Sequence, residues 1–188
     1  APFSTAVNAG VYASTIGRRF DSRGRAYAGA YTDCITDRSG SRAFSDELPL
    51  TGTFAMRSST CPTSTVRPLS SDADELKDHI NLMRADGMTA GHLGISWAWY
   101  LLSPEWSAVW PSDSAPNAYD NLDYQKVAIL MTDGQFNTQY ESANGSSEAQ
   151  SRQLCDNMKA QNMVVYTVGF QVPASALPIL QYCATSPR

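Results

Sequence analysis

The stretch "KVAILMTDGQFNTQY", residues 126–140, changes character in its middle. Residues 127–131 form an unbroken apolar run, which Thr132-Asp133-Gly134 ends abruptly. A short apolar run bounded by turn residues is typical of a buried β-strand. Two explanations account for the carboxylate at its end. The strand leads into an ordinary turn, or it carries Asp133 to a binding edge.

Helical patterns alternate with strands on both sides of this stretch. One helix is predicted over about residues 70–87, after a serine cap, and a second from near residue 89 to Leu102, before a Ser-Pro pair. Residues 146–161 predict a third helix, 163–172 a second buried strand and 174–183 a short last helix. This order is typical of a mostly parallel sheet flanked by helices.

The predicted sheet gives Asp133 a significant position. Both strands are apolar along their length, so both are expected to be buried on both faces. Ligands of open parallel sheets bind beyond the carboxyl ends of the strands, where Asp133 lies. We interpret residues 1–188 as a single domain, with an irregular insertion over residues 11–70 that is rich in Ser, Thr, Gly, Arg and Pro.

Composition excludes several classes of protein. Hydrophobic residues make up 43% of the chain and charged residues 17%, which indicates a globular protein with a packed core. The net charge is -4 and no basic run occurs, so there is no electrostatic footprint for nucleic acid. No apolar stretch approaches the length of a membrane span.

The four cysteines are widely spaced and form no C-x-x-C pair, which disfavours a zinc site. An even count fits two disulfides, and three pairings are open, as is a set of four buried thiols. We favour Cys34 with Cys61 and Cys155 with Cys183, because each pair brackets one local unit. The first pair would staple the insertion, and both imply an oxidising compartment.

Two loops carry the candidate site. Thr89 lies between Gly87 and Gly91 before a predicted helix, and Asp133 precedes Gly134 after a predicted strand. A hydroxyl and a carboxylate suit a hard divalent cation, which prefers oxygen ligands. As a bare motif, Thr-Asp-Gly is common by chance.

The sequence around these loops is more specific than the Thr-Asp-Gly motif itself. "KVAILMTDGQFNT", "GMTAGHLGISWAWYLLSP" and "CDNMKAQNMVVYTVGFQV" together resemble the von Willebrand factor A-type (vWA) domain, and more narrowly its version in Tad-type (Flp) pilus assembly proteins of bacteria. The terminal segments "PFSTAVNAG" and "LQYCATSP" resemble that subfamily too. The resemblance implies a Rossmann-like fold and a metal-ion-dependent adhesion site, in which Thr89 and Asp133 would bind Mg²⁺ or another divalent cation.

The adhesion site of that family also uses an Asp-x-Ser-x-Ser loop, which belongs upstream of "PFSTAVN". We therefore expect the chain to be a partial domain, cut at both ends, that lacks this loop. Residues 37–41, "DRSGS", fit the pattern letter for letter. No buried strand precedes them and Pro49 interrupts the helix that should follow, so we interpret them as surface loop.

Other candidates have simpler explanations. We expect His92 to bond backbone groups at a helix start and His79 to be solvated. The four tryptophans are expected to pack in the core and beneath a loop. Gly91-His92-Leu93-Gly94-Ile95-Ser96 is no nucleophile elbow, so no catalytic pair supports an enzyme.

These observations predict a non-enzymatic binding or assembly module of a Tad-type pilus system, located in the periplasm, on the cell surface or outside the cell. Its partner would be a pilus or surface protein, contacted in part through a divalent cation. The remainder of its own polypeptide is a second expected partner, completing the sheet. The alternatives are a structural vWA domain with a degenerate metal site and, less favoured, a secreted hydrolase.

Overall fold

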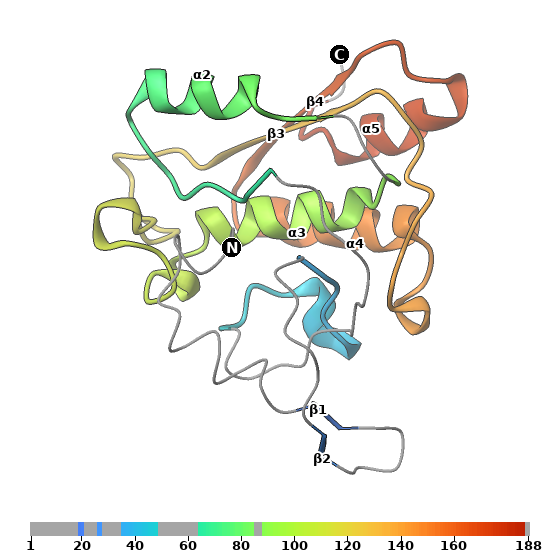
Figure 1. Cartoon of the computed structure of the whole chain (residues 1–188), viewed down its shortest axis with the longest axis horizontal. Coiled ribbons are helices and arrows are strands. Elements are labelled where there is room, and N and C mark those ends of the chain that lie inside the picture. The colour runs from blue at the N-terminus through green and yellow to red at the C-terminus, as the bar shows by residue number, and fades with distance from the viewer. Residues whose placement is uncertain (1–18, 21–25, 28–34, 49–63, 85–87, 187–188) are drawn as a thin grey trace.

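The computed structural model describes residues 19–20, 26–27, 35–48, 64–84 and 88–186. Within these ranges the chain combines two two-stranded sheets with four α-helices. The mixed α/β class is therefore confirmed, and Figure 1 shows α3 and α4 side by side in the middle of the molecule. Among the described residues, no helix has the length and apolar character needed to cross a membrane.

The sheet that positions the candidate site consists of β3, Val127–Thr132, and β4, Val164–Gly169. The two strands run parallel, with Val127 opposite Val164 and Thr132 opposite Gly169. Both strands lie where the apolar runs predict them. Within the described residues this sheet has two strands, so the larger vWA or Rossmann-like sheet remains an expectation.

The predicted helices form, but the first of them begins at Ala73 and ends at Asn81, well before the predicted stop at Gly87. Asp72, rather than a serine, caps α2, and its Oδ1 accepts the backbone N–H groups of Asp74 and Glu75. Ser146 caps α4 and accepts the N–H of Ala149. The helices are α2 (Ala73–Asn81), α3 (Gly91–Leu102), α4 (Ser147–Ala160) and α5 (Leu177–Cys183).

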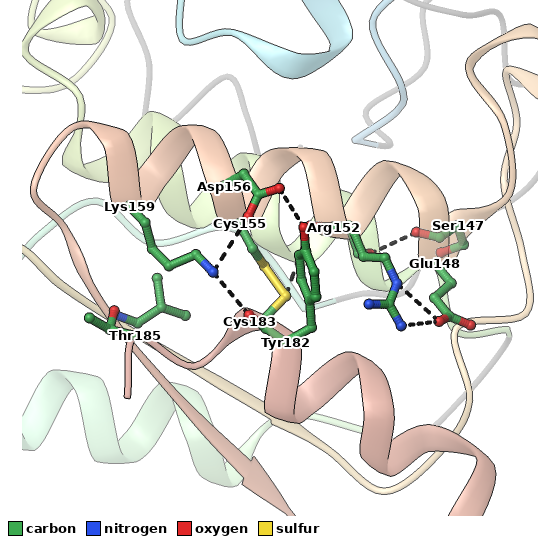
Figure 2. Close-up of a disulfide and its surroundings, with 11 residues drawn as sticks. Ser147, Glu148, Arg152, Cys155, Asp156, Lys159, Tyr182, Cys183 and Thr185 are labelled. Atoms are coloured by element: carbon green, nitrogen blue, oxygen red, sulfur yellow. Dashed lines mark hydrogen bonds and ion pairs between the residues drawn. A yellow bond between two sulfur atoms is a disulfide. The ribbon is translucent and has the colours of Figure 1, made fainter. Parts of the chain in front are cut away.

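A disulfide between Cys155 and Cys183 joins α4 to α5, as predicted. Both cysteines are buried, and their Cα atoms are 5.2 Å apart. Figure 2 shows Tyr182 beside this bond, between the side chains of Arg152 and Lys159. The predicted bond between Cys34 and Cys61 lies outside the described residues.

One face of the β3–β4 sheet is covered by three helices. Side chains of α3, α4 and α5 pack against the inward-facing residues Ala128 and Val165. At 20 to 33 cal/mol per Å² of apolar area buried, this packing is a main source of stability. The buried members of this core are Ile95, Trp99, Ala128, Leu154, Cys155, Met158, Met163, Val165, Ile179 and Cys183.

The other face of the same sheet is open, which corrects the expectation of burial on both faces. Ile129 is 65% exposed and Met131 is 72% exposed. The cause is that α3, α4 and α5 all pack on the opposite side. We call this surface the open face; its side chains are Val127, Ile129, Met131, Tyr166, Val168 and Phe170.

A second core forms on the side of α3 that points away from the sheet. Tyr100 and Trp106 stack with ring centroids 4.1 Å apart, and Trp97, Val109 and Trp110 complete the cluster. All four tryptophans are buried, as predicted. Because this second cluster exists, α3 is buried on two sides rather than along one stripe.

Residues 35–48, one described segment of the insertion, lie against this second core; we call this segment the strap. Ile35 and Leu48 pack on the aromatic cluster, while Phe44 packs on the sheet-side core. The strap contains a five-residue 3-10 helix, Gly40–Phe44. Elsewhere in the insertion, β1 (Arg19–Phe20) pairs antiparallel with β2 (Ala26–Tyr27).

Candidate functional site

The loops of Thr89 and Asp133 meet at the carboxyl end of β3. The carbonyl of Thr89 accepts the N–H groups of Asn137 at 3.0 Å and Thr138 at 3.2 Å. The N–H of Thr89 donates to Oδ1 of Asn137 at 3.1 Å. A Cβ added to Gly134, next to Asp133, would lie 3.9 Å from Oγ1 of Thr89. The fold therefore brings the two predicted site loops together.

Gly91 makes this approach possible. The ring of Phe136 lies so close that a Cβ on Gly91 would be 2.3 Å from ring carbons. Any side chain at position 91 would therefore push the ring away. The glycine lets the loop after β3 pack directly on the first turn of α3, which follows Thr89.

Asp133 is exposed and available to a ligand. Among the described residues, no donor or cation forms a hydrogen bond or ion pair with its carboxylate. An arginine salt bridge, which would have made Asp133 a structural turn residue, is therefore not found within the described ranges. One carboxylate and one hydroxyl supply two oxygen ligands for a hard cation, and waters or a partner would fill the other positions.

Nothing else in the described chain enlarges this ligand set. No group of three or more His, Cys, Asp or Glu side chains within the described ranges is placed to hold a metal ion. The residues present thus fit a weak cation site at most. Such a site would gain affinity from an additional carboxylate outside this set.

Asp37 lies in the loop whose sequence fits the Asp-x-Ser-x-Ser pattern, but its side chain binds other parts of the protein. Its Oδ1 accepts from Nε2 of His92 at 2.8 Å, and its Oδ2 accepts the N–H groups of Tyr140 at 2.9 Å and Glu141 at 2.8 Å. Both carboxylate oxygens are therefore occupied by protein donors. The interpretation of this loop as surface is wrong for Asp37, which is buried, and right for Ser41, which is exposed.

His92 links Asp37 to the start of α4. Its Nδ1 lies 2.8 Å from Oγ of Ser147, so Ser147, His92 and Asp37 form a continuous chain of side chains. Nε2 donates to the carboxylate, and the direction of the hydrogen bond between Nδ1 and the Ser147 hydroxyl depends on the protonation of the imidazole. The prediction that His92 bonds backbone groups is wrong.

This chain has the residue types of a serine hydrolase triad but not its accessibility. Ser147 is 1% exposed, His92 2% and Asp37 3%. A nucleophile must reach its substrate, and a fully covered hydroxyl cannot. We therefore interpret Ser147, His92 and Asp37 as a structural set of buried, hydrogen-bonded side chains, called the clamp below. The clamp joins the strap, α3, α4 and the loop after β3. Each pair in it is separated by 55 residues, so no local signal in the sequence announces it.

The clamp holds Asp37 as a carboxylate. Burial raises the pKa of Asp37, but the hydrogen bond and charge of His92 and the two backbone donors outweigh it, so the pKa lies below 3.8. At neutral pH the side chain is ionised and can accept all three hydrogen bonds. The same donors would be left unpaired in a protein without this carboxylate.

Asp46 anchors the other end of the strap. Its Oδ2 accepts from the hydroxyls of Ser103 and Tyr119, both at 2.5 Å, and its carbonyl accepts from Nε1 of Trp106 at 2.9 Å. Burial and the bond to Asp46 raise the pKa of Tyr119, so its hydroxyl stays protonated and donates. Asp37 and Asp46 thus fasten the strap near the two ends of α3.

His79 also departs from its prediction. The side chain is buried, not solvated. Its Nε2 donates to the carbonyl of Thr65 at 3.0 Å, and its Nδ1 accepts from Nε of Arg67 at 3.2 Å. These bonds attach α2 to the preceding segment and give His79 a structural role.

Comparison of the chain with protein-family models, with curated proteins and with solved structures yielded no match.

Proposed function

We propose that this chain is a non-enzymatic, extracytoplasmic binding or assembly module of vWA type, which contacts a protein partner in part through a divalent cation. The observation that carries the proposal is the approach of the Thr89 loop to Gly134 at the carboxyl end of β3. In parallel sheets this edge is the usual ligand-binding position. The resemblance to Tad-type pilus proteins supplies the class of partner, a pilus or surface component.

Three features support the proposal. Asp133 is exposed, and no described residue pairs with it, so its carboxylate can bind an external ion. Thr89 is held by two backbone bonds and one side-chain bond, which fixes its position relative to the turn. The disulfide between Cys155 and Cys183 favours a periplasmic or extracellular location.

Manganese titration tests the cation site directly, with the loss of the free Mn²⁺ paramagnetic resonance signal as the readout. We expect saturable binding with a dissociation constant of about 1 mM, typical of weak extracellular oxygen sites. Asp133→Ala and Thr89→Val should each weaken binding at least fivefold. Asp120→Ala removes another exposed carboxylate and serves as the matched control, with no expected effect.

The titration also separates the alternatives. If wild-type protein shows no saturable binding, the structural vWA domain with a degenerate site is favoured. If Asp133→Ala and Thr89→Val bind as well as wild type, the cation lies elsewhere and the proposed site is wrong. Covalent labelling of Ser147 by a fluorophosphonate would instead favour the hydrolase alternative.

A further inference from the structure

Two segments of the chain hold Thr89 in place. One is the loop after β3, in which the backbone N–H of Asn137 donates to the carbonyl of Thr89 at 3.0 Å and its Oδ1 accepts the N–H of Thr89 at 3.1 Å. The other is α3, which begins at Gly91, directly after Thr89 and its neighbour. The distance between the Thr89 hydroxyl and Asp133 therefore depends on how α3 and this loop are held relative to each other.

One carboxylate joins these two segments. Oδ2 of Asp37 accepts the N–H groups of Tyr140 at 2.9 Å and Glu141 at 2.8 Å, in the same loop as Asn137. Oδ1 of Asp37 accepts from Nε2 of His92 at 2.8 Å, and His92 lies in the first turn of α3. The side chain of Asp37 thus connects the loop after β3 to the start of α3; we call this connection the Asp37 bridge.

The Asp37 bridge leaves little freedom to either segment. Asp37 and His92 are both buried, and Nδ1 of His92 lies 2.8 Å from Oγ of Ser147 at the start of α4. A buried carboxylate with fixed partners accepts one arrangement of them, because a displacement leaves polar groups unpaired. The ring of Phe136 packs against Gly91 and limits how closely the loop approaches α3. The directional hydrogen bonds of the bridge fix the orientation as well.

We propose that Asp37 is a positioning residue of the cation site, which holds the Thr89 hydroxyl at the separation from Asp133 that a divalent cation requires. The strap then contributes to cation binding through His92 and the loop after β3, without supplying a ligand. This inference rests on the proposed function, because it concerns the same site. A site with two protein oxygens depends on their preset separation, and loss of such outer contacts typically costs about 10- to 100-fold in metal affinity.

The alternative is that Asp37 only fastens the strap. Asp46 provides the comparison, because it fastens the strap near the other end of α3. Its hydrogen bonds reach Ser103, Tyr119 and Trp106, all outside the loop after β3 and the first turn of α3. Asp46→Ala should therefore loosen the strap without displacing the candidate site.

The first measurement needs no metal ion. Hydrogen exchange followed by NMR reads the Thr89 amide, whose hydrogen bond to Asn137 reports the position of the loop. We expect Asp37→Ala to speed this exchange about tenfold or more relative to Asp46→Ala, with urea used to bring both variants to equal global stability. His92→Leu removes only the connection to α3 and should show the same change, which keeps the test available if Asp37→Ala does not fold.

Wild-type protein provides a test that needs no variant. If the Asp37 bridge ties the two segments together, the amides of Thr89, Tyr140 and Glu141 should open in one step. Their free energies of opening would then agree at each urea concentration in native-state hydrogen exchange. Opening of Thr89 that is independent of Tyr140 and Glu141 would overturn the proposal.

Manganese titration then measures the effect on the cation. We expect Asp37→Ala and His92→Leu to weaken Mn²⁺ binding about tenfold or more, and Asp46→Ala to bind like wild type. Asp37→Asn should restore binding, because the amide can accept the two backbone N–H groups and donate to Nε2 of the other neutral tautomer of His92. Circular dichroism checks that each variant is folded.

The two proposals fail in different ways. If wild type binds no Mn²⁺, the proposed function is wrong, and the exchange measurements alone decide whether Asp37 holds Thr89 in place. If wild type binds Mn²⁺ and a folded Asp37→Ala or His92→Leu variant binds equally well, Asp37 has no positioning role. Equal losses in Asp37→Ala and Asp46→Ala would assign the effect to strap stability. Equal losses in Asp37→Ala and Asp37→Asn would assign it to charge, and either result overturns the positioning role.

Discussion

The two sides of the helical layer are closed in opposite ways. On one side the strap is fastened by the buried Asp37, whose carboxylate accepts three hydrogen bonds, and by the part-buried Asp46, whose carboxylate accepts two and whose carbonyl accepts one. On the other side the helices cover one face of the β3–β4 sheet, whose second face remains open and apolar. The two sides of the helical layer therefore differ in the polar or apolar character of the contacts that close them.

The difference shows what each kind of contact specifies. A buried carboxylate with three donors accepts one arrangement of its neighbours, because any other leaves polar groups unpaired. An apolar face is satisfied by many covers of suitable shape. The strap side is thus closed by specific polar contacts, while none of the described segments covers the open face.

Removal of the Asp37 carboxylate should give the largest effect. Asp37→Ala leaves one buried and two part-buried donors without their acceptor, so we expect unfolding free energy to fall by about 3 to 5 kcal/mol, as for other broken buried pairs. Urea denaturation measures this loss, with Asp120→Ala as the exposed control. A loss below 1 kcal/mol would show that the strap contributes little to the fold.

The disulfide should rank next. Loss of the bond between Cys155 and Cys183 opens a loop with a sequence separation of 28 residues. The chain-entropy model gives about 3 to 4 kcal/mol for such a loop. The double variant Cys155→Ala with Cys183→Ala can be compared with wild type by urea denaturation. Equal stability would mean that packing of α5 on α4 suffices.

Two methionines compare the covered and open surfaces directly. Met158 lies on α4 and is fully buried in the core between the helices and the β3–β4 sheet, so Met158→Ala should lower unfolding free energy by about 2 to 5 kcal/mol. Met131 lies on the open face, and Met131→Ala should change it by less than about 0.5 kcal/mol. A large loss at Met131 would indicate that the open face is covered in the isolated protein.

The smallest effect should be a pH dependence from Asp37. Its folded pKa is depressed by His92 and by the backbone donors despite burial, so ionisation favours the folded state. This contribution is complete above the ordinary pKa of 3.8 and is lost as pH falls through the folded value. Unfolding free energy of wild type should therefore fall more steeply below pH 4 than that of Asp37→Asn. Parallel pH curves would assign the acid sensitivity to other carboxylates.

Local sequence signals identified the helices and strands of residues 70–183, although the end of α2 lies earlier than predicted. The apolar run at 127–131, the serine before α4 and the Ser-Pro pair after α3 each act through neighbours a few residues away. The pairing of Cys155 with Cys183 could be favoured because it brackets one helix–strand–helix unit. The expectation that the loops of Thr89 and Asp133 lie together came from the resemblance to the vWA domain, not from a local signal.

Only the tertiary structure decided the partners of the buried polar groups and the state of each sheet face. The clamp brings together Asp37, His92 and Ser147, although 55 residues separate the two partners of each hydrogen bond. The residue types alone would also permit a metal ligand, a solvated histidine or a helix cap. The apolar pattern of β3 likewise shows that both faces can be buried, not which one is. Which face is buried depends on the segments that the tertiary structure packs against each face. The residues of the strand itself do not determine this packing.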